Sequence, residues 1–163
     1  MVEIVVDGFA QAMQAPKGVI VPPLPPALRN RHSVRFYSPA EVRTWQTTAR
    51  VLAAERMQGQ NPLQGPLEVV IWVYLVPPAS MSQKKRALAL DGKIRPVTRP
   101  YCDNYSKSIC DSLTGIVWID DSHICSLHVY KYYAEKPRVV IKVDNAIDTL
   151  MAHSAPKQTG LFH

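Results

Sequence analysis

The segment that most constrains the fold of this chain is an apolar stretch, Leu67–Val76, enclosed by Gly65-Pro66 and Pro77-Pro78. β-Branched and aromatic residues dominate it, and both of its alternating faces are apolar. This pattern predicts a strand at the centre of a sheet, because a strand buried on both faces has a continuous apolar sequence. The longest uninterrupted apolar run, Val69–Val76, has eight residues. A membrane-spanning helix needs ~20, so no membrane association is expected.

Other elements are predicted on both sides of this strand. Ser38-Pro39-Ala40-Glu41 is typical of a helix start, with serine at the cap, proline at the first position and glutamate at the third. This helix is predicted to run to about Gln58, with a core face made by Val42, Trp45, Ala49, Leu52 and Ala53. The remaining predicted elements are a strand over 2–6, a short basic helix from residue 80, a helix from 103 to 115, a strand over 124–133, and a strand over 139–143 that pairs with it as a hairpin.

Two regions are predicted to lack helices and strands. Pro16–Pro39 is rich in proline and arginine, which predicts a loop; its arginines either contact a DNA backbone or simply keep the loop soluble. Residues 145–163 show no periodicity and are predicted to be a flexible C-terminal tail. Residues 1–144 are then a single domain, in keeping with a chain of 163 residues.

The balance of charge predicts an anionic partner. The net charge is +6 and the pI is about 9.3, which favours nucleic acid. Lys84, Lys85 and Arg86 lie in the most basic segment, which is either a phosphate-binding surface, a solvated face or an import signal. The N-terminal residues lack the basic start and apolar core of a signal peptide, so a cytoplasmic location is expected.

The three cysteines are an odd number, which is consistent with free thiols in a reducing compartment. A zinc-stabilised interaction domain is an alternative that would recruit Cys102, Cys110, His123, Cys125 and His128. The chain has no Cys-x2-Cys pair, however, and the spacing of these residues is not that of usual zinc sites.

The candidate chemistry lies between residues 101 and 121. On a helix, Asp103, Lys107 and Asp111 fall on one stripe. Asp103 is either a helix cap with an ion pair to Lys107, or part of a site completed by Asp120-Asp121 at the following turn. Two adjacent carboxylates repel each other unless a cation or water neutralises them, and we expect the turn to return toward the N-terminal end of the helix. Oxygen ligands of this kind suit Mg²⁺, which would serve phosphate-ester chemistry.

At these residues the sequence resembles a known family. The motifs are Pro100-Tyr101-Cys102-Asp103-Asn104-Tyr105-Ser106-Lys107, Asp111-Ser112-Leu113-Thr114-Gly115, Trp118-Ile119-Asp120-Asp121-Ser122-His123-Ile124, and Lys131. They are similar to those of the RusA family of Holliday-junction resolvases, which are prophage-associated endodeoxyribonucleases. The resemblance is dense over Pro100–Lys131 and looser from about Val2 to Val143.

The resemblance implies an α+β fold, with a small mixed β-sheet and flanking helices, in a homodimer. It implies a bacterial or phage-encoded enzyme with paired Mg²⁺-dependent sites (Mn²⁺ as the substitute) that nick four-way junctions in recombination and repair. By motif position, Asp103, Lys107 and Asp121 are the implied catalytic residues; Asp103 and Asp121 are metal ligands, with Asp120 assisting. Lys131 and the segment Lys84-Lys85-Arg86 are the implied DNA contacts.

One position departs from the family pattern. The first acidic ligand falls at Tyr101, whose neutral phenol is a poor ligand for magnesium. Asp120, Asp111 or another carboxylate would then replace the missing ligand, or the enzyme would need a higher concentration of metal ion. The alternative is a catalytically weakened or inactive homologue that still binds branched DNA in a structure-selective way.

Overall fold

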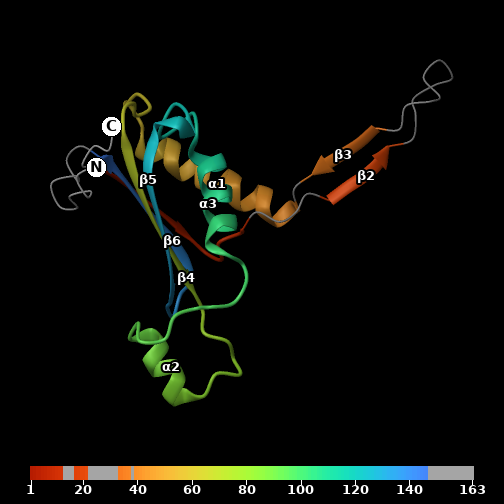
Figure 1. Ribbon diagram of the computed structural model, residues 1–163, viewed down its shortest axis with the longest axis vertical. Helices are drawn as coiled ribbons and strands as arrows, with labels where there is room; N and C mark the ends of the chain where they lie inside the picture. The colour runs from red at the N-terminus through yellow and green to blue at the C-terminus, as the bar shows by residue number, and fades with distance from the viewer. Residues whose placement is uncertain (13–16, 22–32, 38, 147–163) are drawn as a thin grey trace, which may run out of the picture.

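The computed structural model describes residues 1–12, 17–21, 33–37 and 39–146 (Figure 1). The fold is α+β, as the sequence predicts. A four-stranded mixed sheet has the order β1-β6-β4-β5. Its strands are β1 (Val2–Asp7), β4 (Leu67–Leu75), β5 (Ile124–Tyr133) and β6 (Arg138–Asn145). The helices are α1 (Ala40–Arg56), α2 (Gln83–Leu90) and α3 (Cys102–Leu113), and a short 3-10 helix, η2 (Asp121–His123), precedes β5.

The apolar segment forms β4, which lies inside the sheet as predicted. It pairs in parallel with β5 and antiparallel with β6. The predicted hairpin between β5 and β6 is wrong, because β6 crosses to the other side of β4 and pairs there with both β4 and β1. The burial of the strands explains this order. Val139, Ile141 and Val143 of β6 are fully buried, whereas β5 is half exposed and suits the edge.

The core lies between one face of the sheet and two helices. Helices α1 and α3 pack on the same face, as Figure 1 shows. The predicted core face of α1 is confirmed, with Leu52 half-buried at its margin. The fully buried side chains opposite the helices come from alternate positions of β4, namely Leu67, Val69, Ile71 and Val73. This layer fixes α3, the helix that carries the candidate site residues.

The N-terminal region differs from the prediction in two respects. The expected loop contains two antiparallel strands, β2 (Lys17–Val21) and β3 (Ser33–Tyr37), which form a separate two-stranded sheet. The β-branched residues of these segments favour strands, and the prolines at 22, 23, 25 and 26 lie between them in the sequence, outside the described residues. The N-cap of α1 is Pro39, which makes no side-chain cap, one position later than predicted; Ser38 lies outside the described residues.

The basic helix α2 stands apart from the other two helices, at the opposite end of the molecule from the N-terminus (Figure 1). It begins after Ser82, and Lys84 and Lys85 on its first turn are exposed. β6 extends to Asn145, and the predicted tail lies almost entirely outside the described residues. In the part of the chain that the structure describes, none of the helices is long and apolar enough to cross a membrane.

Candidate functional site

A hollow of about 290 Å³ lies where α3, η2 and β5 meet. It is lined by Ser106, Lys107, Cys110, Asp111, Asp121, Ile124 and Leu127. The stripe on α3 and the turn before β5 therefore converge, and two of the three predicted catalytic residues, Lys107 and Asp121, face the same space. We call this hollow the α3–β5 pocket.

Asp121 is held by two side-chain donors. Its Oδ1 atom accepts a hydrogen bond from the Thr114 hydroxyl and another, 2.7 Å long, from the Trp118 Nε1–H group. The Trp118 side chain is fully buried, so its indole is a fixed donor. Among the described residues, no protein group donates to Oδ2 of Asp121. The carboxylate is thus oriented through one oxygen while the other is available to a ligand.

Asp120 is a local cap in this structure. Its Oδ1 accepts a hydrogen bond from the backbone N–H of Ser122, 2.9 Å away, at the start of η2. Hydrogen bonding from Ser122, side chain first and backbone second, lowers the pKa of Asp120. The adjacent carboxylates of Asp120 and Asp121 are therefore each stabilised by their own donors, and their proximity does not by itself require a cation.

Asp103 is exposed in the first turn of α3, but it is not the helix cap, because the N-cap residue is Tyr101. No ion pair joins Asp103 to Lys107 within the described ranges. The interpretation of Asp103 as a helix cap with an ion pair to Lys107 is therefore wrong. Among the residues that the structure describes, none forms a hydrogen bond or ion pair with the exposed carboxylate of Asp103.

The expected return of the Asp121 turn to the N-terminal end of α3 is also wrong. The connection after α3 is short and tight: Gly115 donates to the Trp118 carbonyl at 2.7 Å, so Asp121 stays beside Thr114 at the C-terminal end. Eight residues of helix separate Asp103 from Asp111, which is about 12 Å at 1.5 Å per residue. Accordingly, the described part of the chain contains no group of three or more acidic, histidine or cysteine side chains able to hold a metal.

The predicted DNA contacts differ in whether their cationic groups are already hydrogen-bonded within the protein. The Lys131 ammonium donates to the carbonyl oxygens of Thr98 (2.7 Å) and Pro100 (3.0 Å), and so ties β5 to the segment before α3. Arg86 donates to the Pro77 carbonyl at 3.5 Å. Lys84 and Lys85 are exposed to solvent.

Comparison with known proteins decides the family. The family model for endodeoxyribonuclease RusA matches residues 18–144, most of the chain. The chain belongs to the RusA family. It is also 36% identical over 94 residues to the Bacillus subtilis (strain 168) protein named "Uncharacterized protein YqaN", covering 56% of this chain and 66% of that protein, just under two thirds of its length. RusA membership confirms the resemblance.

Position 101, where the RusA pattern has an acid, presents an aromatic ring and a cation here. Tyr101 is 52% exposed, and its hydroxyl accepts a hydrogen bond from Arg99 Nε at 3.0 Å. The Arg99 guanidinium also lies 5.4 Å from the centre of the Tyr101 ring. A cation, Arg99, therefore lies against the side chain of residue 101.

The thiols of this RusA protein do not form a zinc site in the described part of the chain, where all three cysteines are free. Burial, followed by the negative charges of Asp121 and Asp111, raises the pKa of the Cys110 thiol to about 12. Without a bound metal, Cys110 is therefore protonated at neutral pH, and it forms part of the wall of the α3–β5 pocket.

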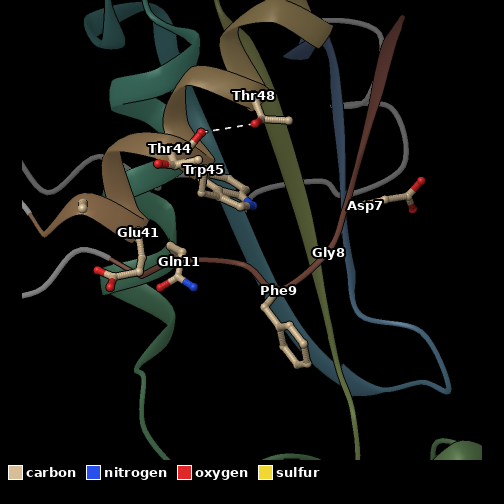
Figure 2. Close-up of a pocket in the computed structure, with 9 residues that line it drawn as sticks. Asp7, Gly8, Phe9, Gln11, Glu41, Thr44, Trp45 and Thr48 are labelled. Carbon is tan, nitrogen blue, oxygen red and sulfur yellow. Dashed lines mark hydrogen bonds between the residues drawn. The ribbon is translucent and has the colours of Figure 1, made fainter.

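Thr114 and Trp118 are the site residues that the sequence reasoning missed as functional. Their signal in the sequence is the spacing of Thr114, Trp118 and Asp121 around the turn that begins at Gly115, which is too common to single out. A second hollow, about 480 Å³, lies between the end of β1 and the start of α1 (Figure 2). It is lined by Asp7, Gly8, Phe9, Gln11, Ala40, Glu41, Thr44, Trp45 and Thr48, and it contains none of the predicted site residues.

Proposed function

We propose that this RusA protein is a Mg²⁺-dependent endonuclease that resolves Holliday junctions and related branched DNA by paired nicks, in recombination and repair. The observation that carries the proposal is the α3–β5 pocket of a RusA-family chain, in which an anchored carboxylate, Asp121, lies beside Lys107. A cytoplasmic, bacterial or phage-encoded enzyme, including one from a prophage, fits this activity.

The residues present suit a hard divalent cation. Asp121 has an oxygen without a protein donor, Asp111 lines the same hollow, and Asp103 is exposed on the same helix. Carboxylate oxygens are the ligands that Mg²⁺ prefers, and the thiol in this pocket stays protonated. When bound, the ion would supply Lewis-acid polarisation of the scissile phosphate. Lys107, in the same pocket, would balance the charge that grows on that phosphate, and Thr114 and Trp118 would keep Asp121 oriented.

Assembly as a homodimer would reconcile the separation of the two proposed metal ligands. Asp103 lies in the first turn of α3, whereas Asp121 is bonded to Thr114 just after the end of this helix, so the two proposed ligands belong to different ends of α3. A two-fold axis beside α3 would run the two helices antiparallel, and would set Asp103 near Asp121 of the partner subunit. Two such sites suit the symmetric strands of a four-way junction.

A labelled synthetic four-way junction tests the activity, incubated with Mg²⁺, with Mn²⁺ and with chelator. We expect metal-dependent paired nicks from the natural protein. Asp121→Asn and Asp103→Asn should each abolish nicking while junction binding persists. Glu55→Gln, which removes an exposed acid from α1, is the matched control and should cut normally. Normal cutting by Asp121→Asn would show that the assignment of the metal site is wrong.

The second candidate is a structure-selective DNA-binding protein with weakened or lost cleavage. The pairing of Tyr101 with Arg99, where the RusA pattern has an acid, favours it. Tyr101→Asp distinguishes the two functions. If the natural protein binds junctions without cutting them and Tyr101→Asp restores cutting, the chain has kept the scaffold and lost the chemistry. If the natural protein cuts and Tyr101→Asp adds nothing, other groups complete the site.

A further inference from the structure

The sheet has a second face, opposite α1 and α3, that carries the side chains at the other alternating positions. In the register of β4 and β5, Trp72 lies opposite Tyr130 and Tyr74 lies opposite Tyr132. Tyr130 is 40% exposed and Val5, farther across the same face, is 44% exposed. This face therefore reaches solvent, and four aromatic residues lie together on it.

The four rings, Trp72, Tyr74, Tyr130 and Tyr132, form what we call the aromatic patch. The ring centres of Trp72 and Tyr130 are 6.3 Å apart with planes 23° from parallel, and those of Tyr74 and Tyr132 are 5.8 Å apart at 29°. The His128 ring continues the row, 6.5 Å from Tyr130 and within 5° of its plane. Neighbouring rings thus share nearly one orientation and present a row of flat π surfaces.

Guanidinium groups border the aromatic patch. The central carbon of the Arg95 guanidinium lies 3.4 Å from the centre of the Tyr132 ring, and that of Arg138 lies 4.1 Å from the centre of the Tyr74 ring. Arg95 also donates a hydrogen bond of 2.8 Å to the Tyr132 hydroxyl. Arg95 donates another hydrogen bond of 3.1 Å to the Lys131 carbonyl oxygen, so each arginine is held in place by a ring and Arg95 by the backbone as well.

The charged side chains on this face determine which kind of ligand it suits. Within the described ranges, neither Arg95 nor Arg138 forms an ion pair. Three acidic groups nearby are engaged, Glu3 with Lys142 at 3.2 Å, Glu68 with His128 at 3.3 Å and Asp144 with the N-terminal amine at 3.5 Å, whereas Asp7, the cross-strand partner of Arg138, forms no ion pair among the described residues. A ligand that brings its own negative charge would therefore find two positioned arginines beside the rings.

We propose that the aromatic patch, with Arg95 and Arg138, binds a single-stranded segment of DNA. Unpaired bases would stack on the exposed rings, Tyr130 above all, and the phosphates would meet the two guanidinium groups. A second copy of this chain is the competing occupant of this face, and the oligomeric state of the variants below distinguishes it from DNA. The proposal rests on the proposed function insofar as DNA is the substrate, and unpaired strands occur where branched DNA is opened.

Tryptophan fluorescence tests this proposal without cleavage. The chain has three tryptophans, of which Trp45 is 7% exposed and Trp118 fully buried, so quenching by a ligand on the surface reports mainly on Trp72. The full chain is titrated with short oligodeoxythymidine in the presence of chelator. We expect saturable quenching. Because no metal is present, a failure of the nuclease proposal leaves this readout unchanged.

Variants of the aromatic patch decide the outcome. Tyr130→Ala should weaken binding about tenfold, since one stacked base contributes roughly that much, and Tyr130→Phe should restore it. Arg138→Gln should weaken binding and reduce its salt dependence. Phe9→Ala, which removes a 62% exposed aromatic elsewhere, is the control and should bind normally. Absent quenching, equal affinity of Tyr130→Ala and the natural chain, or dissociation of a dimer by Tyr130→Ala with binding intact, would overturn the proposal.

Discussion

The hydroxyl of Thr114 links the fold to the proposed chemistry, because it contacts Asp121 Oδ1 and also the Cys110 carbonyl oxygen at 2.9 Å; Thr114→Val removes both contacts with little change of shape. A hydrogen bond to a charged acceptor contributes ~1.5–3 kcal/mol when it is well shielded. Asp121 is exposed and keeps its second donor, Trp118, so the lower end applies. We expect the free energy of unfolding to fall by ~1.5 kcal/mol, because the rest of the packing is unchanged.

The effect on cleavage should be larger than the effect on stability. With one donor left, the carboxylate of Asp121 rotates about the bond to Trp118, and a displacement near 1 Å costs up to ~100-fold in rate. We expect single-turnover cleavage of a four-way junction to slow about tenfold or more, with junction affinity unchanged. Thr114→Ser is the matched control, since it keeps the hydroxyl and should retain most of the rate.

Two results would refute this reasoning. If Thr114→Val cuts at the natural rate while Asp121→Asn does not cut, then Asp121 needs no orientation by Thr114. If Thr114→Val and Thr114→Ser lose the same rate, the cause is packing around residue 114 and not the hydrogen bond. Urea unfolding of each variant, measured in the same buffer, separates a loss of folded protein from a loss of rate.

Two further predictions concern stability. The folded-state pKa of Cys110, raised to about 12 by burial and then by Asp121 and Asp111, lies above its value in the unfolded chain. Its contribution to stability is therefore complete below the unfolded pKa of about 8.5 and is lost as pH rises toward 12; urea midpoints should fall more steeply above pH ~9 in the natural chain than in Cys110→Ala, and parallel curves would contradict this. Ile71→Ala, at a fully buried position of β4, should cost ~2–5 kcal/mol in urea unfolding, whereas Val51→Ala at an exposed position of α1 should change it little.

The elements that could be predicted from the sequence are those whose burial is periodic. The apolar run of β4 and the core face of α1 record which side chains are buried, and the helix over α3 follows from the same pattern. Strand pairing is a different kind of information, because it joins segments far apart in the chain. The short turn at Glu135-Lys136-Pro137 favoured a β5–β6 hairpin locally, but β6, with three fully buried residues, belongs inside the sheet.

The candidate site, too, could be predicted from the sequence only in part. Helical spacing correctly placed Lys107 and Asp111 on one face, and the structure brings Asp121 to that face. What spacing could not give is the end of α3 at which Asp121 lies, because that depends on the Gly115–Trp118 hydrogen bond and on a buried indole. The roles of Asp103, Lys107, Asp120 and Asp121 in cleavage stay predictions.

Because the proposed ligands lie at different ends of α3, an experiment can distinguish a cleavage site shared between two subunits from a site within one chain. If each site is shared between subunits, cleavage requires a dimer, and its rate per chain falls when the protein is diluted below the dimer dissociation constant. If one chain is sufficient, the rate per chain is independent of dilution. Because Asp103 and Asp121 lie at opposite ends of one helix, the shared site also predicts that an equimolar mixture of Asp103→Asn and Asp121→Asn chains recovers cleavage at one of two sites. Such a mixture would then nick junctions on one strand without resolving them, an outcome that a site within one chain does not allow.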